Sequence, residues 1–332
     1  MKSGKPCDLE RLDARIPQWD LSALTKRDCP FCRSEHEPLL VRPDSLPLAF
    51  CSGCGCWYVA QLPSVSDIKR LYEGYYCSHR PVDLSVTRAA RVLEQVRRAS
   101  ETDWQLKILS RLLGGLGGKR ILDVGCGWGR FLVMARSAGA DVVGCDLSPG
   151  ACEFANHGLG ITVYQSDLHS CSSAIGDVDA VVMRDFVEHP IEPLIDLQAA
   201  RAILKPGGLL LWHTPNGEEA GTNVETAKQW VGFRVDLEHL QYVSPRTVNW
   251  LSRRLDLSIE RLDAFGFPGL HGIEALPKAR SRSVDWARDV AGRIPYVRTM
   301  ARVLQSVTAE IRGECRDPRL GSYHLFAILR QA

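Results

Sequence analysis

The sequence predicts an α/β protein in which a parallel sheet is covered by helices on both faces and is preceded by a small cysteine-rich module. Apolar stretches alternate with helical segments downstream of residue 119, which is typical of a parallel sheet with two covered faces. A glycine-rich turn follows the first of these stretches, in "RILDVGCGWGRFL", residues 120–132. Seven of the twelve cysteines precede residue 80, which sets the front of the chain apart.

The composition is that of a packed globular protein with little net charge. Apolar residues make up 45% and charged residues 24% of the 332 residues, and the formal net charge is +2. These values exclude wholesale disorder and give no electrostatic argument for nucleic-acid binding. The beginning, "MKSGKPCDLERLD", lacks the apolar stretch of a signal peptide, and the longest apolar runs are too short to cross a bilayer. We therefore expect a cytoplasmic protein.

Two cysteine pairs near the front predict a structural zinc site. Cys29-x2-Cys32 and Cys51-x2-Cys54 have the spacing of a zinc ribbon, and each pair can place two thiolates on one face of a tetrahedron. The residues between the pairs read as short extended segments. Cys56 is an alternative ligand to Cys54. Because four sulfur ligands leave no open position, we expect Zn²⁺ to fold the module and to do no chemistry.

The remaining elements follow in chain order. Ser64 or Ser66 can cap a short helix, and residues 86–113 read as two helices broken near Ser100. The apolar stretches that follow predict strands at 120–126, 141–148, 161–167, 178–186, 207–216, 257–267 and 323–332. The intervening patterns predict helices at 129–139, 149–160 and 191–204, and another that begins after Ser244 and runs through Leu251.

The glycine turn differs from the dinucleotide-binding fingerprint in two ways. In Gly125-x-Gly127-x-Gly129 the third glycine comes one residue earlier than in G-x-G-x-x-G. An acid, Asp123, also precedes the turn. A carboxylate at this place repels a pyrophosphate but suits a ligand with a sulfonium and an ammonium group.

Two more acids end the next two strands. Asp146 closes the second strand, and its carboxylate, which only accepts hydrogen bonds, suits the two hydroxyls of a ribose. Asp167 follows the third strand, where an adenine amino group can donate to it. Ligands of such sheets bind outside the carboxyl ends of the strands, so the three acids should line one site.

These segments resemble the class I S-adenosylmethionine-dependent methyltransferases. The resemblance covers "ILDVGCGWGRF", "VVGCDLSP", "VYQSD", "DAVVMRDFVEHP" and "ILKPGGLLLWHTPN", in the family's order. It implies a Rossmann-like seven-stranded sheet whose last strand is inserted antiparallel, with S-adenosylmethionine as the cofactor. It also implies the following cofactor-binding residues: Asp123, Gly125, Cys126, Gly127, Gly129, Asp146, Leu147, Asp167, Leu168 and Arg184.

The fourth strand ends in "RDFVEHP", at the rim where the methyl acceptor should lie. In ubiquinone-type O-methyltransferases a similar E-x-x-E-H pattern is associated with a divalent metal, and here Asp185 replaces its first glutamate. The resemblance leaves three readings of Glu188 and His189. They hold a metal together with Asp185, His189 is an acid–base catalyst, or the pair only orders its loop.

A second glutamate–histidine pair, Glu238-His239, precedes the helix that begins after Ser244. This segment resembles the zinc-containing methyltransferases of deoxysugar and polysaccharide pathways, in which a histidine of a comparable pair is a candidate base. We therefore expect His239, His189 and Glu238 to be the catalytic residues, with His239 favoured as the base. A histidine has a suitable intrinsic pKa for that role at neutral pH.

The expected domains are a zinc-ribbon-like module (1–80), a helical connector (81–118), a methyltransferase core (119–268 and 319–332) and a basic helical insertion (269–318). The insertion reads as a lid, a dimer contact or a peripheral membrane contact through 278–312. We expect the module and the glycine turn to have separate cores, so that zinc loss would unfold the front and leave cofactor binding partly intact.

The expected activity is methyl transfer from S-adenosylmethionine to oxygen or carbon of a small-molecule or sugar acceptor, in secondary-metabolite or polysaccharide biosynthesis. One alternative is a metal-assisted O-methyltransferase of a phenolic or quinone-type acceptor, and another is a non-catalytic zinc-ribbon scaffold. A nicotinamide-dependent oxidoreductase fits the glycine spacing poorly. No nucleic-acid partner is expected, because the ribbon segment has only Arg33 and Arg42 as basic residues.

Overall fold

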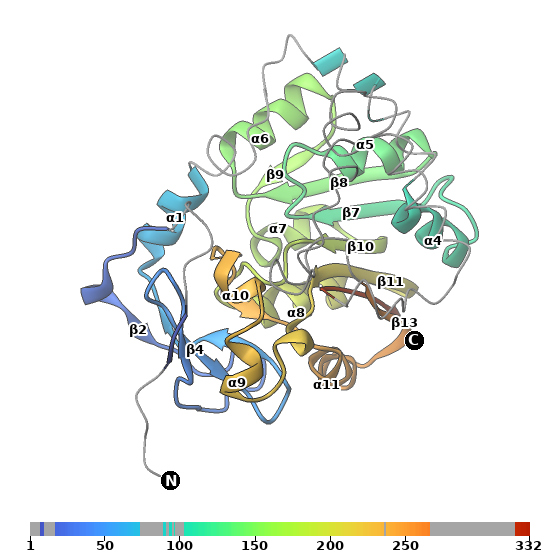
Figure 1. The fold of residues 1–332 in the computed structure, drawn as a ribbon. Coiled ribbons are helices and arrows are strands. Elements are labelled where there is room, and N and C mark those ends of the chain that lie inside the picture. Colours follow the sequence, from blue (N-terminus) through green and yellow to red (C-terminus); the bar gives the residue numbers. More distant parts are fainter. Residues whose placement is uncertain are drawn as a thin grey trace, which may run out of the picture.

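The computed structural model shows an α/β sheet with a smaller sheet at its side (Figure 1). It describes residues 7–9, 17–73, 89–90, 93–94, 96, 103–235, 237–265 and 323–332. The predicted insertion at 269–318 and much of the predicted connector lie outside the described residues. None of the helices in the described part of the chain combines the length and the hydropathy needed to span a bilayer.

The large sheet has seven strands in the order β13-β14-β11-β10-β7-β8-β9. The strands are β7 (Arg120–Val124), β8 (Asp141–Asp146), β9 (Val163–Gln165), β10 (Val178–Arg184), β11 (Leu204–Pro215), β13 (Leu257–Phe265) and β14 (His324–Gln331). β11, β10, β7, β8 and β9 are parallel to one another, whereas β14 lies antiparallel between β11 and β13. The seven-stranded sheet and its antiparallel last strand are thus confirmed.

Alternate residues of each strand enter two different cores, as the period of a pleated strand requires. Ile121 and Val182 belong to the buried cluster of one face, which also takes residues of the helices α4 (Trp104–Leu112), α5 (Arg130–Ser137) and α6 (Pro149–Glu153). Leu122 and Val181 belong to the cluster of the other face, with residues of α7 (Leu168–Ile175), α8 (Pro193–Ile203) and α11 (Pro245–Leu255). The prediction of helices on both faces is confirmed.

The helix α7 was not predicted, because "LHSCSSAI" is short and contains serine and cysteine in place of strong helix formers. Its beginning is fixed by Asp167, whose side chain accepts a hydrogen bond from the Ser170 amide at 2.8 Å. α11 is four residues longer than its predicted end at Leu251 and begins with a capping box between Ser244 and Thr247. The predicted helix at 149–160 is α6 followed by a π-helical turn, Phe154–Gly158.

The front of the chain forms a five-stranded sheet in the order β1-β3-β4-β5-β12 and a two-stranded sheet, β2-β6. Its elements are β1 (Cys7–Asp8), η1 (Leu21–Ala23), β2 (Thr25–Lys26), β3 (Leu40–Val41), β4 (Pro47–Phe50), β5 (Trp57–Val59), β6 (Gln61–Leu62) and the helix α1 (Val65–Glu73). Ser64 caps α1 by accepting from the Asp67 amide at 3.1 Å. The strand β12 (Gln241–Tyr242) comes from far along the chain, and it pairs antiparallel with β5.

The expectation of separate cores holds for the glycine turn but not for the strand that precedes it. Cys126 of the turn lies in a buried cluster that contains no described residue of the front module. Cys29 and Cys51 of the front belong to the same buried cluster as Leu122 and Val124 of β7. A further cluster joins Trp57 of β5 to residues of the short helices η4 (Gly217–Ala220), α9 (Val224–Ala227) and α10 (Gly232–Val235). In Figure 1 the front module, drawn in blue, lies beside α9 and α10. The module therefore folds against the methyltransferase sheet.

Candidate functional site

The glycine turn connects β7 to α5 and brings backbone amides to the carboxyl edge of the sheet. All three glycines have positive φ, 67° for Gly125, 54° for Gly127 and 86° for Gly129, a region that other residues rarely adopt. The amides of Gly125 and Cys126 donate to the Cys145 carbonyl of β8 at 2.9 and 3.2 Å. A Cβ atom on Gly125 would lie 2.6 Å from the Phe186 ring, so this position leaves no room for a side chain.

Asp146 closes β8 directly beside the turn. Its carboxylate accepts hydrogen bonds from the amides of Gly127 and Ser148, each at 2.8 Å, one on either oxygen. Burial raises the pKa of Asp146, and these amide bonds oppose the rise. Each carboxylate oxygen has a second lone pair, so the group can still accept from two hydroxyls of a ribose.

Asp123 is buried at the end of β7, on the same edge of the sheet. Burial raises its pKa to about 7, the charge of Arg184 opposes the rise, and that of Asp146 adds to it. Arg184, at the end of β10, lies with its guanidinium carbon 4.9 Å from the centre of the Phe131 ring and 3.7 Å, through Nη1, from the Asp103 carboxylate. A positively charged ligand placed near Asp123 would favour its ionised form.

The exposure of the neighbouring apolar side chains fits a ring-bearing ligand at this edge. Leu147 follows Asp146 and is 63% exposed, so its side chain is accessible to a ligand at this edge. Leu168 is fully buried beneath the same edge, and Asp167 caps α7. The structure thus places the proposed cofactor residues at the carboxyl edge of β7, β8, β9 and β10, with amides, carboxylates and an exposed apolar side chain suited to S-adenosylmethionine.

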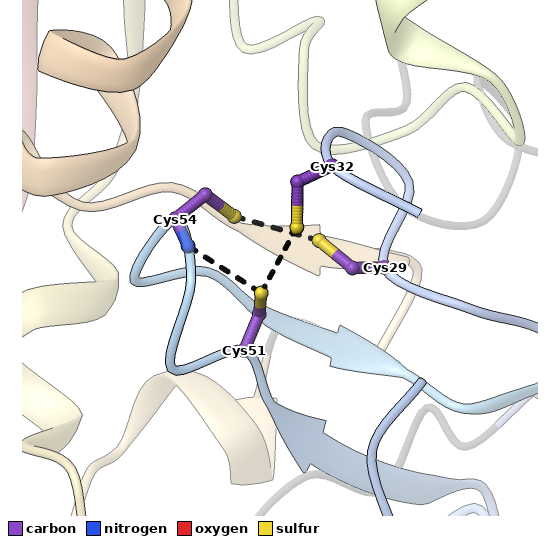
Figure 2. Close-up of side chains that lie close together, drawn as sticks. All are labelled: Cys29, Cys32, Cys51 and Cys54. Atoms are coloured by element: carbon purple, nitrogen blue, oxygen red, sulfur yellow. Dashed lines mark hydrogen bonds between the residues drawn. The ribbon is translucent and has the colours of Figure 1, made fainter. Parts of the chain in front are cut away.

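The four predicted zinc ligands lie together. Figure 2 shows the sulfur atoms of Cys29, Cys32, Cys51 and Cys54 facing one another. The Sγ atoms of Cys29 and Cys54 are 3.4 Å apart, those of Cys32 and Cys51 are 3.2 Å apart, and all four lie within 4.8 Å of one another. A tetrahedral zinc site with about 2.3 Å Zn–S bonds has sulfurs about 3.8 Å apart, so the cluster fits Zn²⁺.

Cys56, the alternative ligand, is not a member of this four-cysteine cluster. It is fully buried, and its thiol donates to the Trp57 carbonyl at 3.1 Å. The first residues of α11 pack on the same knuckle, since the Arg246 guanidinium donates to the Ser52 carbonyl at 2.5 Å. The four-cysteine cluster is therefore held between the front sheet and a helix of the large domain.

The two histidines predicted from separate motifs lie in contact. The ring centroids of His189 and His239 are 4.7 Å apart, with the ring planes at 81°. Donor atoms of Glu188, His189 and His239 all lie within 4.8 Å of one another, and Glu188 is fully buried. We name these three residues the histidine cluster. Two imidazoles and a carboxylate at this spacing can exchange a proton with a ligand or hold a divalent cation.

Tyr72 of α1 also reaches this cluster. Its hydroxyl lies 2.8 Å from Nδ1 of His189, within hydrogen-bond distance. Sequence reasoning missed Tyr72 because it reads as an apolar position of an amphipathic helix. The fold brings the front of the chain to residues more than a hundred positions later.

Asp185 and Glu238 lie outside the histidine cluster. Asp185, expected to hold a metal with Glu188 and His189, has its Oδ1 atom 3.2 Å from Nδ1 of His213 in β11, and its φ of 51° is rare for a residue with a side chain. Glu238 is half-buried and is not among the clustered donor groups, so the carboxylate beside the two histidines is that of Glu188. His213 is stacked on His324, with ring centroids 4.8 Å apart. The sequence analysis did not single out His213 as a residue of this rim.

Curated relatives match part of the chain, among them two ubiquinone biosynthesis O-methyltransferases. Ubiquinone biosynthesis O-methyltransferase of Bordetella avium (strain 197N) is 35% identical over 118 residues, which are 34% of this chain and 49% of that protein. The protein of the same name from Pectobacterium atrosepticum is 31% identical over 153 residues, 43% of this chain and 58% of that protein. The chain thus spans about half the length of the curated relatives it matches.

Among the solved structures that match are two methyltransferases. One is an S-adenosylmethionine-dependent methyltransferase from Archaeoglobus fulgidus, 19% identical, at a TM-score of 0.45, covering 79% of this chain and 99% of that chain. The other is magnesium protoporphyrin IX methyltransferase from Synechocystis PCC 6803, 14% identical, at a TM-score of 0.45, covering 82% of this chain and 100% of that chain.

The sequence itself shows the family. Residues 93–262, about half of the chain, match the family described as "Methyltransferase domain". This range includes the glycine turn, Asp146 and both histidines of the cluster. The chain therefore belongs to the class I S-adenosylmethionine-dependent methyltransferases, with a zinc-ribbon-like module at its front.

Proposed function

We propose that this protein transfers a methyl group from S-adenosylmethionine to a hydroxyl of a small-molecule acceptor. The observation that carries the proposal is the histidine cluster, which stands at the end of β10, on the same edge of the sheet as the glycine turn and Asp146. The names of the relatives, all O-methyltransferases of ubiquinone biosynthesis, support oxygen as the attacking atom.

The cofactor side of the site is assigned to the turn after β7. Asp146 would hold the ribose hydroxyls, and the ionised form of Asp123 would favour the cationic end of the cofactor. Leu147 would border the adenine with its exposed side chain and Leu168, whose side chain is buried, with its main chain, and Asp167 would be an acceptor beside them. When bound, S-adenosylmethionine supplies an electrophilic methyl group on a sulfonium sulfur.

The acceptor side is assigned to the histidine cluster. His239 would take the proton of the acceptor hydroxyl, because an imidazole has a suitable intrinsic pKa for this at neutral pH. Tyr72 would orient His189 through Nδ1, and His189 would in turn pack against the His239 ring. Positioning by these groups contributes to the rate in addition to proton transfer.

A transfer assay with methyl-labelled S-adenosylmethionine tests the proposal. The acceptors should include catechols and polyprenylated phenols on one side and nucleotide-linked sugars on the other. The proposal expects labelled product with at least one hydroxyl-bearing acceptor, and demethylated cofactor in equal amount. If S-adenosylmethionine binds but none of these acceptors is labelled, the small-molecule O-methyltransferase proposal fails.

Metal-assisted O-methylation of a phenolic acceptor is the second candidate function. Glu188, His189 and His239 offer one carboxylate and two imidazoles within 4.8 Å, a set that suits a divalent metal. The discriminating experiment is turnover after chelation. Activity that disappears with a chelator and returns with Mg²⁺ or Mn²⁺ supports the metal, whereas unchanged activity supports His239 as a metal-free base.

We also propose a metal ion for the four-cysteine cluster and a class of pathway for the acceptor. The four-cysteine cluster would hold one structural zinc ion per chain, which its sulfur geometry supports. The acceptor would belong to secondary-metabolite or polysaccharide biosynthesis, in line with the resemblance of the Glu238-His239 segment to deoxysugar enzymes. The acceptor panel decides between a sugar and a phenol of the quinone type.

A further inference from the structure

Two buried arginines of the front module bind the two loops that carry the histidine cluster. Arg42 lies between β3 and β4, and Arg27 follows β2, more than 140 positions before either loop. Their side chains are 2% and 7% exposed, although arginine is rarely buried. A buried guanidinium needs partners for its donors, so the partners of each arginine indicate what it does.

Arg42 uses all five of its N–H groups. Nε and Nη2 donate to Asp44 at 3.0 and 2.6 Å, in an ion pair that is fully buried. The remaining three donate to the carbonyls of Leu237 and His239, at 2.7 and 2.5 Å, and to the Tyr242 hydroxyl at 2.9 Å. Asp44 alone would satisfy only two of these donors. Two of the other three bind the main chain on both sides of Glu238, and the third binds the Tyr242 side chain.

Arg27 and Gln241 bind the other loop. The Arg27 guanidinium donates to the Ile191 carbonyl at 2.9 Å and to the side-chain oxygen of Gln241 at 2.7 Å. The Gln241 amide in turn donates to the carbonyls of Val187 and Pro190, at 2.7 and 2.9 Å. Burial lowers the pKa of Arg27 to about 10, so its guanidinium stays charged at neutral pH.

The two loops are also joined directly, since the Leu240 amide donates to the Glu188 carbonyl at 2.8 Å. The loops that carry the His189 and His239 rings are therefore held by a backbone bond of their own and by the hydrogen bonds of the two arginines. The strands and α-helices of the large domain do not fix the backbone of these two loops, because residues 185–192 and 237–240 lie outside them.

We propose that Arg42 and Arg27 are positioning residues of the acceptor site, through which the front module sets the geometry of the His189–His239 pair. The proposal takes from the proposed function only that this pair serves the acceptor. It gives the zinc-ribbon-like module a role beyond its own stability, because the module carries the donors that order the two loops.

The test is hydrogen exchange measured by mass spectrometry on the full-length, zinc-loaded protein. The double variant Arg42→Met with Asp44→Leu removes the donors and the buried charge together, because loss of one partner alone would leave an unpaired charge inside. Amides in 187–192 and 237–243 should then exchange about tenfold faster or more, because their loops open locally. Peptides of the glycine turn should keep their exchange rates, and the Kd of S-adenosylhomocysteine should stay within about twofold of the wild-type value.

Two further variants keep the test decisive. Arg42→Lys retains a charge opposite Asp44 but cannot reach both carbonyls at once, so loop exchange should lie between the wild type and the double variant. Arg33→Met is the matched control. Arg33 also joins the module to the region after β10, but through an exposed ion pair with Glu192. Its loss should leave the exchange rates of both loops unchanged.

Function gives an independent readout. With an acceptor found in the transfer assay, kcat should fall about thirtyfold or more in the double variant while the KM for S-adenosylmethionine stays nearly constant. Loop exchange that is unchanged in the double and Arg42→Lys variants overturns the proposal. So does faster exchange spread evenly over the glycine turn and the loops, which would make Arg42 an ordinary core residue. Failure to find any acceptor contradicts the proposed function and leaves the exchange result to decide the positioning role.

Discussion

The glycine turn is built almost wholly from one stretch of chain, residues 123–130, with Asp146 from the neighbouring strand. The histidine cluster, in contrast, depends on Arg27, Arg42 and Tyr72 of the front module and on two loops about fifty residues apart. The proposed cofactor site is thus formed largely by residues close together in the chain, whereas the proposed acceptor site is assembled by tertiary contacts. Changes in the front module should therefore act unequally on the two sites.

The largest effect should come from the zinc ligands. In Cys29→Ser with Cys51→Ser, elemental analysis should find zinc lost, and the melting temperature should fall by about 10 °C or more, since structural zinc contributes free energy to folding directly. Because the module shares a buried cluster with β7, calorimetry should show one transition at lower temperature. Cys56→Ser is the control and should retain its zinc, because Cys56 is outside the cluster. Two separate transitions would contradict the shared core.

Asp146→Ala should remove most of the affinity for the cofactor. Loss of two charge-assisted hydrogen bonds costs about 2 to 4 kcal/mol, or roughly a factor of 30 to 1,000 in Kd. Calorimetry with S-adenosylhomocysteine measures this change. Asp141→Ala, at the opposite end of the same strand and paired there with Arg120, should bind like the wild type. Equal affinity of both variants would remove Asp146 from the cofactor site.

His239→Gln should lower kcat by roughly a hundredfold and leave cofactor affinity nearly unchanged, because it removes only the proposed base. His189→Gln should have a smaller effect unless a metal is bound there. The exposed His157 provides the control variant, His157→Gln. Full turnover of both cluster variants would mean that the acceptor needs no protein base from either histidine, and His213 would be the next to replace.

The pH dependence of cofactor binding should be the mildest effect. The pKa of Asp123 is raised to about 7 without ligand, and a bound cation lowers it, so binding should release a proton near neutral pH. Affinity for S-adenosylmethionine should rise by up to about tenfold from pH 6 to pH 8. Calorimetry in buffers of different ionisation enthalpy detects the released proton. The affinity of Asp123→Asn for S-adenosylmethionine should depend little on pH. If the affinity of the wild-type protein were equally independent of pH, Asp123 would not be the group that releases the proton.

The parts predicted from the sequence are those encoded by short patterns. The apolar strands, the glycine turn with its adjoining acids and the two cysteine pairs each depend on residues close together in the chain. The structure brings the four cysteines together and places Asp123 and Asp146 at one edge, as expected.

The parts that were missed depend on long-range contacts. From the sequence, Arg42 is expected to be a surface charge of the ribbon. Its burial depends on the carbonyls of Leu237 and His239, which lie almost two hundred residues later and which no local pattern around Arg42 and Asp44 indicates. The pairing of β12 with β5 was missed because two residues give no strand pattern. The resemblance to the E-x-x-E-H pattern groups Asp185 with Glu188, whereas in the structure Asp185 has a left-handed backbone conformation and its carboxylate lies beside His213.

The most direct test of the account is calorimetry of the wild-type protein with S-adenosylmethionine, S-adenosylhomocysteine and NAD, under the same conditions. Both S-adenosyl compounds should bind at one site per chain, and NAD should not bind, because the acids beside the turn disfavour a pyrophosphate. Binding of NAD together with no measurable binding of either S-adenosyl compound would contradict the cofactor site, and with it the division of the molecule into a local cofactor site and a tertiary acceptor site.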